Sequence, residues 1–252
     1  MKKTKFHINW LLVSVLTLVS GLLQAQSEPY QAGLHYTVLE DAPAVSDGQI
    51  ELYEAFSYLC THCNTFEPYI SAWKKRKPEN VTFIRIPIVF GRAAWEIYAR
   101  GYVTAQTMGI GDEAHTAMMD RIWNEKAVMR TMEEIADFYS QFGVSAESFL
   151  ATSKSFAVDA RMRKDQRMAM DWQIKGTPSL VLDGKYRIEG NEAIPSFDAM
   201  LDVVDYLIAK ETAEALEYAA AAAPVEEAEL NDELATEAEQ AAAAQVEDVS
   251  EQ

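Results

Sequence analysis

Cysteine is scarce in this chain, with two residues among 252, and histidine is nearly as scarce, with four. A structural zinc site needs four nitrogen or sulfur ligands, and there is no second C-x-x-C pair to supply them. The histidines are scattered through the sequence at His7, His35, His62 and His115. We therefore expect neither a metal nor another cofactor, and the cysteines are left to form a disulfide or a redox pair.

Long apolar runs are absent beyond the first 25 residues. The one such run, Trp10–Leu23, follows three lysines, which is the pattern of an export signal that is cleaved near Ala25. A membrane anchor is the alternative, but the run is shorter than the roughly 20 residues that a spanning helix needs. We expect residues 1–25 to be a signal peptide, and the mature protein to be soluble in a compartment where disulfides persist.

Basic residues are absent from residues 211–252, which carry 13 acidic side chains and most of the formal net charge of −17. Binding to phosphates needs clustered Lys and Arg, so we expect no nucleic-acid partner. The segment is rich in Ala and Glu, contains Pro224 and has no aromatic residue after Tyr218. Because it cannot bury a core, we expect a disordered or transiently helical tail, with a docking segment as the alternative.

The two cysteines, Cys60 and Cys63, lie between an apolar strand pattern at Ile50–Tyr58 and a helical pattern that extends to about Lys75. The first turn of a helix presents unpaired backbone N–H groups and a partial charge of about +0.5. A thiolate there is stabilised, so its pKa falls and it becomes a good nucleophile and leaving group. The two-residue spacing also keeps both sulfurs within disulfide reach. This pattern predicts a redox pair, with an inert structural disulfide as the alternative.

Each residue of the C-T-H-C segment has an expected role. Cys60 is nearest the helix start and solvent, so we expect it to be the attacking and leaving sulfur, and Cys63 to be the buried resolving thiol. His62 is expected to stabilise the thiolate by a hydrogen bond or, when protonated, by its charge; a solvated loop histidine is the alternative. Thr61 is expected to face the client and, with His62, to tune the reduction potential.

The remaining sequence alternates between strand and helix patterns around one long helical block. Without this block, the order is β-α-β followed by β-β-α, which is the order of the thioredoxin fold. A short strand is also predicted before the first cysteine, at His35–Leu39. The predicted elements after the first helix are a strand at Val81–Phe90, helices over residues 92–170, a hairpin of Ser179–Leu182 with Lys185–Ile188 around an Asp183-Gly184 turn, and a final helix at Ile194–Lys210.

Four segments match the pattern of a known family: E-A-F-S-Y-L-C-T-H-C at Glu54–Cys63, Phe66-Glu67, G-T-P-S-L-V-L-D-G-K-Y at Gly176–Tyr186, and Y-Q-A-G-L-H-Y-T-V-L at Tyr30–Leu39. Over about residues 28–209, the chain resembles the DsbA-like thiol oxidoreductases that Gram-negative bacteria export. The resemblance implies an α/β thioredoxin fold with a helical insertion domain. We expect the thioredoxin-like domain at residues 26–91 and 171–210, the insertion domain at residues 92–170, and the tail at residues 211–252.

The resemblance also implies a role for two residues far from the cysteines in sequence. In the thioredoxin fold, the loop at Pro178 faces the cysteine pair and presents a backbone edge to an extended client peptide. The peptide bond before Pro178 is expected to be cis, with an ordinary trans turn proline as the alternative. Thr177 is expected to hydrogen-bond near Cys60.

Glu54 matches the buried acid of this family, which handles the proton of the resolving thiol during exchange. A lone carboxylate on a buried strand is costly unless it is neutral or has such a use. A surface-facing strand glutamate is the alternative, and Glu51 is the less suited candidate. The family pairs this acid with a lysine on the next strand; this chain has only Arg85 there, a loose match to which that role does not transfer.

Two features of the helical block have two interpretations each. The block holds eight of the ten methionines, whose adaptable side chains suit a client-binding groove or, as we expect for most of them, packing in the core and on the surface. The one basic cluster is a functional patch or, as we expect, the solvated face of a helix. It consists of Arg161, Arg163, Lys164 and Arg167.

The resemblance implies a monomeric periplasmic enzyme that oxidises protein thiols. A client thiolate attacks the Cys60–Cys63 disulfide, a mixed disulfide forms, and the second thiol of the client resolves it. The expected partners are reduced exported client proteins and a DsbB-like membrane quinone reductase that re-oxidises the pair. Two alternatives stay open. One is a disulfide reductase or isomerase, although the sequence before Glu51 has no room for a dimerisation domain, and the other is a non-catalytic peptide-binding chaperone.

Overall fold

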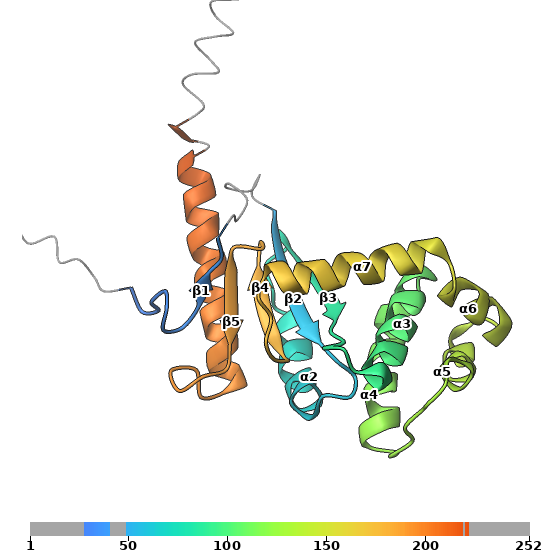
Figure 1. Cartoon of the computed structure of the whole chain (residues 1–252). Helices are drawn as coiled ribbons and strands as arrows, with labels where there is room; N and C mark the ends of the chain where they lie inside the picture. The colour runs from blue at the N-terminus through green and yellow to red at the C-terminus, as the bar shows by residue number, and fades with distance from the viewer. Residues whose placement is uncertain (1–27, 41–48, 219, 222–252) are drawn as a thin grey trace, which may run out of the picture.

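The computed structural model describes residues 28–40, 49–218 and 220–221. A sheet with helices on both faces forms one half of the molecule, and a group of helices forms the other half (Figure 1). The predicted signal peptide and most of the predicted tail lie outside the described residues. Within the described ranges, no helix is both long enough and apolar enough to cross a membrane.

Five strands form one mixed sheet in the order β1-β5-β4-β2-β3. β2 pairs with β3 in parallel, whereas β4 pairs with both β2 and β5 in antiparallel. β2 is suited to the middle of the sheet because its Leu52, Ala55 and Phe56 side chains, which point to both faces, are fully buried. The strands are β1 (Thr37–Val38), β2 (Ile50–Phe56), β3 (Val81–Pro87), β4 (Ser179–Leu182) and β5 (Tyr186–Glu189).

The predicted hairpin is confirmed as β4 and β5. Asp183 and Gly184 have positive φ angles of 52° and 65°, in the three-residue connection at 183–185 between the paired Leu182 and Tyr186. The Lys185 N–H donates to the Leu182 carbonyl at 2.8 Å and closes this turn. Since β4 then runs antiparallel to β2, the residues that precede β4 lie beside the residues that follow β2.

The two faces of the sheet are covered by different helices. Leu52, Leu180 and Leu182 face α2 and the C-terminal helix, whereas Ala55 and Val181 face the end of α7. This alternation is the period of two that a pleated strand imposes. The helices are α2 (Thr61–Lys74), α3 (Ala93–Thr107), α4 (Gly111–Trp123), α5 (Met132–Tyr139), the 3-10 helix η1 (Ser140–Phe142), α6 (Ala146–Ser153), α7 (Phe156–Asp171) and the C-terminal helix at residues 197–218 (orange in Figure 1).

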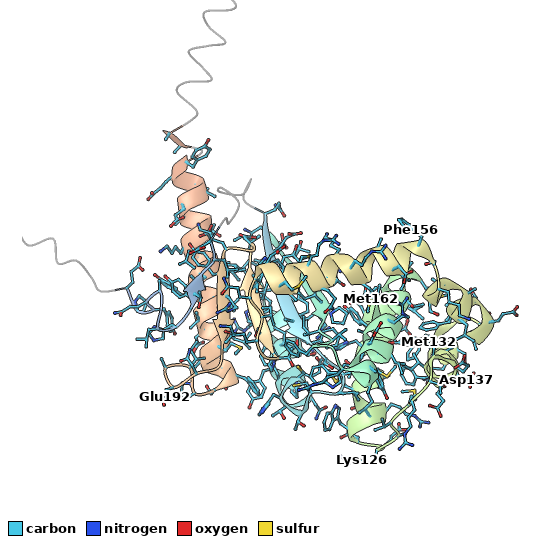
Figure 2. The ribbon with its side chains drawn as sticks, in the orientation of Figure 1. Lys126, Met132, Asp137, Phe156, Met162 and Glu192 are labelled. Atoms are coloured by element: carbon cyan, nitrogen blue, oxygen red, sulfur yellow. The ribbon has the colours of Figure 1, made fainter. Side chains whose placement is uncertain are left out.

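The elements α3 to α7 occupy the stretch for which the sequence predicts helices. α7 runs from this helical block to the sheet: Met162 lies in the core of the block, whereas Phe156 is exposed at the outer end of the helix (Figure 2). Four of the methionines are buried in the same core, which favours packing over a client-binding groove. They are Met118, Met119, Met129 and Met162.

The C-terminal helix continues past Lys210, so the predicted start of the tail at residue 211 is wrong. Glu211 is only 4% exposed, and its Oε1 accepts hydrogen bonds from the Tyr186 hydroxyl and the Lys185 Nζ, both at 2.7 Å. Glu211 follows the buried Leu207 and Ile208 at helical spacing, so it extends the helix face that packs on β5. A carboxylate at this position stays buried because the start of β5 and the turn before it supply the two donors.

Replacing Glu211 by alanine should lower the free energy of unfolding by about 1–3 kcal/mol, because the Tyr186 hydroxyl loses its buried acceptor. Urea-induced unfolding followed by circular dichroism measures this loss. The matched control is Glu214→Ala, since the Glu214 side chain is 41% exposed and lies 3.6 Å from Lys185. The control should change stability by less than about 0.5 kcal/mol. Equal losses in both variants would contradict the assignment of Glu211 to the fold.

Candidate active site

The turn between β2 and α2 carries the cysteine pair. Cys60 is the N-cap of α2, with an extended backbone at φ −93° and ψ 118°. Its N–H donates to the Ser57 carbonyl at 3.1 Å, and its carbonyl accepts from the Asn64 N–H at 3.1 Å. The predicted position of the cysteines, after a strand and at the start of a helix, is therefore confirmed.

The two sulfurs differ in how accessible they are. Cys60 is 9% exposed, whereas Cys63, one helical turn further on, is fully buried in the core of the helical block. Both are free thiols in this structure. An incoming group therefore meets the Cys60 sulfur first. This geometry is compatible with the expected roles of attacking and resolving thiol, which stay predictions.

The surroundings of Cys60 favour its thiolate. The largest effect is a hydrogen bond from the Cys63 thiol, and further hydrogen bonds come from the Thr177 side chain and from backbone N–H groups in the first turn of α2, at His62 and Cys63. These donors outweigh burial, which opposes ionisation, and lower the pKa of Cys60 to about 5. In its thiol form, Cys60 Sγ lies 3.2 Å from the Thr177 carbonyl oxygen and donates to it.

Cys63 has the opposite tendency. Burial is the main cause that raises the pKa of Cys63 far above its ordinary value, and donation to Cys60 and the negative charges of Cys60 and Glu54 raise it further. A hydrogen bond from the Ser57 backbone N–H acts in the other direction but is smaller. The pair consequently holds one thiolate, at Cys60, and one thiol, at Cys63.

The Thr177–Pro178 segment lies beside the cysteines because Ser179, the first residue of β4, pairs with Ala55 near the end of β2. The Thr177–Pro178 peptide bond is cis, as the resemblance implies. A groove of about 500 Å³ extends from this segment, and its position suits a peptide that passes the cysteine pair. It is lined by residues that include His62, Gly176, Thr177, Pro178, Glu189, Phe197 and Met200.

The two residues between the cysteines are both exposed. The His62 side chain lines the groove, and within the described chain its imidazole makes no hydrogen bond to Cys60; only its backbone N–H does. Thr61 starts α2, and its carbonyl accepts from the Thr65 hydroxyl at 3.0 Å. The expected contributions of the His62 ring and of Thr61 stay predictions.

Glu54 is buried on β2, 1% exposed, and it shares one cation with a second acid. Arg85 on β3 donates from Nε to Glu54 Oε2 at 2.7 Å and from Nη2 to Glu67 Oε2 at 3.0 Å. Arg85 therefore bridges β2 and α2 beneath the cysteines. A guanidinium suits this position because its fixed fork of donors can serve two carboxylates at once.

Glu67 receives more hydrogen bonds than Glu54 does. Besides Arg85, its Oε1 accepts from the Ser71 hydroxyl at 2.9 Å and its Oε2 from His115 Nε2 at 3.2 Å. The Tyr58 hydroxyl lies 3.1 Å from the other ring nitrogen of His115. These contacts link α2, α4 and the cysteine turn through buried side chains.

The two acids are pushed toward opposite protonation states. Burial is the main cause that raises the pKa of Glu54, and the negative charge of Glu67 adds to it against the opposing effect of Arg85. Burial also opposes ionisation of Glu67, but the hydrogen bond from His115 and the charge of Arg85 outweigh the effect of burial. The pKa of Glu67 therefore falls to about 2. Burial and the charge of Arg85 lower the pKa of His115 to about 4, so at neutral pH its imidazole is uncharged. Glu67 is thus the anion beside Arg85, and Glu54 holds a proton more readily.

Sequence reasoning missed the contributions of Glu67, His115 and Tyr58. A signal existed for Glu67, because it lies four residues after Cys63 and seven after Cys60, on the buried face of α2. His115 offered no such signal, since the fold alone brings it to the cysteines, 55 positions away from Cys60 in sequence. The burial predicted for Glu54 is confirmed, and Arg85 does stand beside it.

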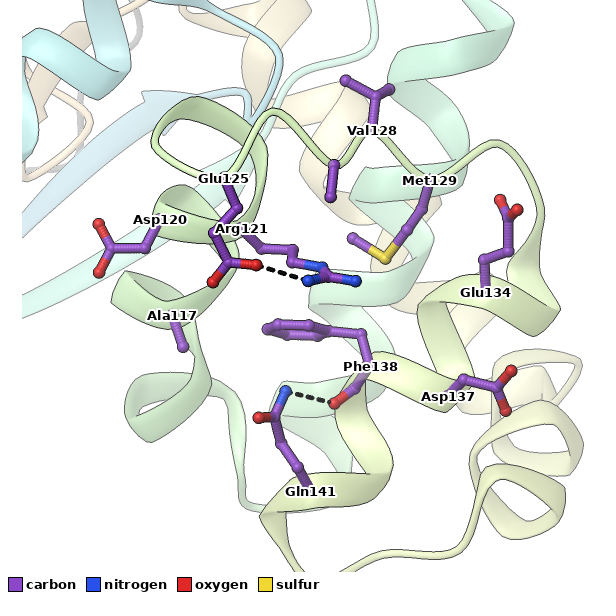
Figure 3. A pocket seen from close by; sticks show the side chains of 11 residues that line it. Ala117, Asp120, Arg121, Glu125, Val128, Met129, Glu134, Asp137, Phe138 and Gln141 are labelled. Carbon is purple, nitrogen blue, oxygen red and sulfur yellow. Dashed lines mark hydrogen bonds and ion pairs between the residues drawn. The ribbon is translucent and has the colours of Figure 1, made fainter.

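Another cavity of the described residues lies away from the cysteine site. It has a volume of about 720 Å³ and opens between the end of α4 and α5, where Arg121, Glu125, Val128, Met129 and Phe138 surround it (Figure 3). None of the residues of the cysteine site lines it. Among the described side chains, no group of three or more His, Cys, Asp or Glu could hold a metal ion.

Comparison with known proteins shows which family the chain belongs to. Residues 51–202 match the family model described as the DSBA-like thioredoxin domain. The "Thiol:disulfide interchange protein DsbA" of Pseudomonas aeruginosa is 38% identical over 210 residues, which cover 82% of this chain and 98% of that protein. The protein of that name from Azotobacter vinelandii is 39% identical over 170 residues, which cover 67% of this chain and 78% of that protein.

Solved structures agree with the sequence relatives. The crystal structure of Pseudomonas aeruginosa DsbA is 37% identical, covers 75% of this chain and 98% of its own, and superposes with a TM-score of 0.68. The oxidoreductase DsbA from Xylella fastidiosa is 32% identical, covers 73% of this chain and 98% of its own, and gives a TM-score of 0.67. The chain belongs to the DSBA-like thioredoxin domain family, and the α/β thioredoxin fold with added helices is confirmed.

The thiolate of Cys60 should form with a midpoint near pH 5 in the reduced protein, as the hydrogen bonds to its sulfur require. Ultraviolet absorbance of the thiolate against pH measures this midpoint. Cys63→Ala should move the midpoint upward, because it removes the largest stabilising donor, and Cys60→Ser should abolish the transition. A wild-type midpoint at the ordinary thiol value, about 8.5, would show that these hydrogen bonds do not stabilise the thiolate.

Replacing Arg85 by methionine should destabilise the protein by about 3–5 kcal/mol, because two buried carboxylates lose their shared cation. Urea-induced unfolding at neutral pH measures the loss. Arg85→Lys is the matched control: it keeps the charge but cannot serve both acids with a fixed fork, so a smaller loss is expected. The loss in Arg85→Met should shrink as pH falls toward the pKa of Glu67, about 2, because the protonated acids no longer need a cation. A loss that does not vary with pH would argue against this explanation.

Proposed function

We propose that the protein is a thiol:disulfide oxidoreductase that donates its Cys60–Cys63 disulfide to reduced client proteins. The observation that carries the proposal is the set of hydrogen-bond donors directed at the Cys60 sulfur, which lower its pKa to about 5. A stabilised thiolate stabilises the reduced form, and this makes the disulfide a stronger oxidant. The names of the relatives from Pseudomonas aeruginosa and Azotobacter vinelandii support the same chemistry.

The exchange begins when a client thiolate attacks the sulfur of Cys60. A client–Cys60 bond forms, the Cys60–Cys63 bond breaks, and Cys63 leaves with the electron pair. A second client thiolate then attacks the client sulfur of this mixed disulfide, and Cys60 leaves as a thiolate. The client loses two electrons and gains a disulfide, while the cysteine pair gains both electrons. The hydrogen bonds to Cys60 lower the free energy of this second leaving group.

Glu54 supplies the proton that Cys63 needs when it leaves. Cys63 is buried and its pKa lies far above the ordinary value, so it ends each cycle as a thiol. Glu54 is a suitable donor because its own pKa is raised and because the two groups interact electrostatically. This role agrees with that of the buried acid in the family.

The groove beside Pro178 is the client-binding surface of this proposal. Thr177, Pro178 and His62 line it next to the reactive sulfur, and Phe197 and Met200 add apolar surface further along. An extended peptide can lie against the backbone of the Thr177–Pro178 segment, and Thr61 flanks its path. Reduced exported proteins are the proposed clients, in the periplasm, after cleavage of the signal peptide near Ala25.

The cycle also needs an electron acceptor for the reduced pair. A DsbB-like membrane quinone reductase is the proposed partner, and the enzyme is proposed to act as a monomer without nucleic acid. The proposed domain division places a thioredoxin-like domain at residues 26–91 and from residue 171 to the C-terminal helix at 197–218, around an insertion at residues 92–170. A disulfide reductase or isomerase is the second candidate function, because either activity would also use the hydrogen bonds that stabilise the Cys60 thiolate.

The test uses the oxidised full-length mature protein and a reduced peptide with two cysteines. Stoichiometric oxidation of the peptide is expected from the wild-type protein and none from Cys60→Ser or Cys63→Ser, because neither variant can hold the disulfide. Once activated as a mixed disulfide at Cys60, Cys63→Ser should form a stable bond to a variant of the peptide with a single cysteine, which has no second thiol to release it. Mass spectrometry of quenched samples counts the disulfides. Reshuffling of a scrambled protein without net oxidation would favour an isomerase. Binding that survives in Cys60→Ser without any exchange would favour a chaperone.

A further inference from the structure

Tyr58, two residues before Cys60, is held by α4 at both its backbone and its side chain. Trp123 Nε1, at the end of α4, donates to the Tyr58 carbonyl at 2.9 Å. His115, about two turns earlier on α4, lies with Nδ1 3.1 Å from the Tyr58 hydroxyl. Tyr58 and His115 are each 1% exposed, so water does not compete for these hydrogen bonds.

The hydrogens of the His115 contacts can be assigned from the chemistry of the partners. Glu67 is a carboxylate and can only accept, so His115 Nε2 carries a hydrogen and donates to it at 3.2 Å. The neutral imidazole then has a lone pair at Nδ1, which accepts from the Tyr58 hydroxyl. One side chain of α4 therefore contacts both the turn before the cysteines, through Tyr58, and the helix after them, through Glu67.

The turn that Tyr58 occupies sets the positions of both sulfurs. Its neighbour Ser57 accepts from the Cys60 N–H at 3.1 Å, and the Ser57 backbone N–H donates to the Cys63 sulfur. Aromatic packing reinforces the arrangement, since the Phe56 and Tyr58 rings lie 5.2 and 5.1 Å from the His115 ring. A shift of Tyr58 would therefore move Cys60 relative to the first turn of α2.

We propose that His115 and Trp123 form a clamp on Tyr58, and that these two positioning residues of the helical block keep the Cys60 sulfur against its hydrogen-bond donors. This inference rests on the proposed function, because the donors matter only if the thiolate takes part in exchange. In the described part of the chain, no hydrogen bond joins either residue to a sulfur, whereas each makes one with Tyr58. Both therefore act through Tyr58. Through the clamp, the helical block affects the position of the Cys60 sulfur, in addition to covering the active site.

The most direct test is Trp123→Phe, which removes the N–H donor and keeps an aromatic ring. The pKa of Cys60, read from thiolate absorbance, should rise by about one unit, and the redox equilibrium with glutathione should shift by about tenfold toward the disulfide at neutral pH. Trp95→Phe is the matched control, since Trp95 is a partly buried tryptophan of α3 that stacks under Arg92 at 4.5 Å. The control should leave both quantities unchanged.

Tyr58→Phe provides the second measurement, because it deletes only the hydroxyl that His115 accepts from. It should shift the pKa of Cys60 in the same direction, and it keeps the test valid if Trp123→Phe does not fold. His115→Asn should be milder than His115→Ala, since the Asn side-chain oxygen can replace Nδ1 as the acceptor.

A purely structural clamp would give a different result. It would lower the melting temperatures of the reduced and oxidised forms equally and leave the pKa of Cys60 and the glutathione equilibrium at the wild-type values in both Trp123→Phe and Tyr58→Phe. That result overturns the inference. If instead the wild-type protein fails to oxidise a two-cysteine peptide, the proposed function fails, while the pKa comparison still decides whether the clamp exists.

Discussion

The stabilisation of one anion, the Cys60 thiolate, is the interaction on which the rest of the structure depends. Burial alone would favour the neutral thiol, so donors must outweigh it. They come from separate parts of the chain: from the first turn of α2, from Cys63 and from Thr177, which precedes β4. The sheet brings them together because β2 ends where α2 starts and because β4 begins beside the end of β2. The ends of the strands thus matter more to the chemistry than their middles.

The parts of this arrangement that follow local rules could be predicted from the sequence. The Asp183-Gly184 turn needs positive φ at both residues, and this requirement alone identifies the hairpin. The apolar run before Cys60 identifies β2, and a cysteine at the start of a helix indicates which sulfur has the lowered pKa. The cis bond at Pro178 and the buried acid Glu54 needed the resemblance to a family, because no local pattern assigns them.

The parts that depend on tertiary contacts could not be predicted. Nothing in the sequence near His115 indicates that it meets Glu67, since their contact requires α4 to pack against α2. The end of the C-terminal helix could not be predicted for the same reason. A run of Ala and Glu has no core of its own, but the Glu211 carboxylate is buried because Lys185 and Tyr186 of the hairpin donate hydrogen bonds to it. Composition describes how a segment behaves in isolation, whereas here hydrogen bonds from the hairpin stabilise the continued helix at Glu211.

The buried charges explain why the pKa of Glu54 is raised whereas that of Glu67 is lowered. Arg85 supplies one positive charge for two carboxylates, so the pair can balance only one anion without a further cost. Glu67 accepts from Arg85, His115 and Ser71, whereas Arg85 is the one side-chain donor that contacts Glu54 in the described part of the chain. The negative charge is therefore better stabilised on Glu67, and the acid with the raised pKa is the one that interacts electrostatically with Cys63. The clamp residue His115 has a second effect here, because its donation to Glu67 lowers the pKa of that acid.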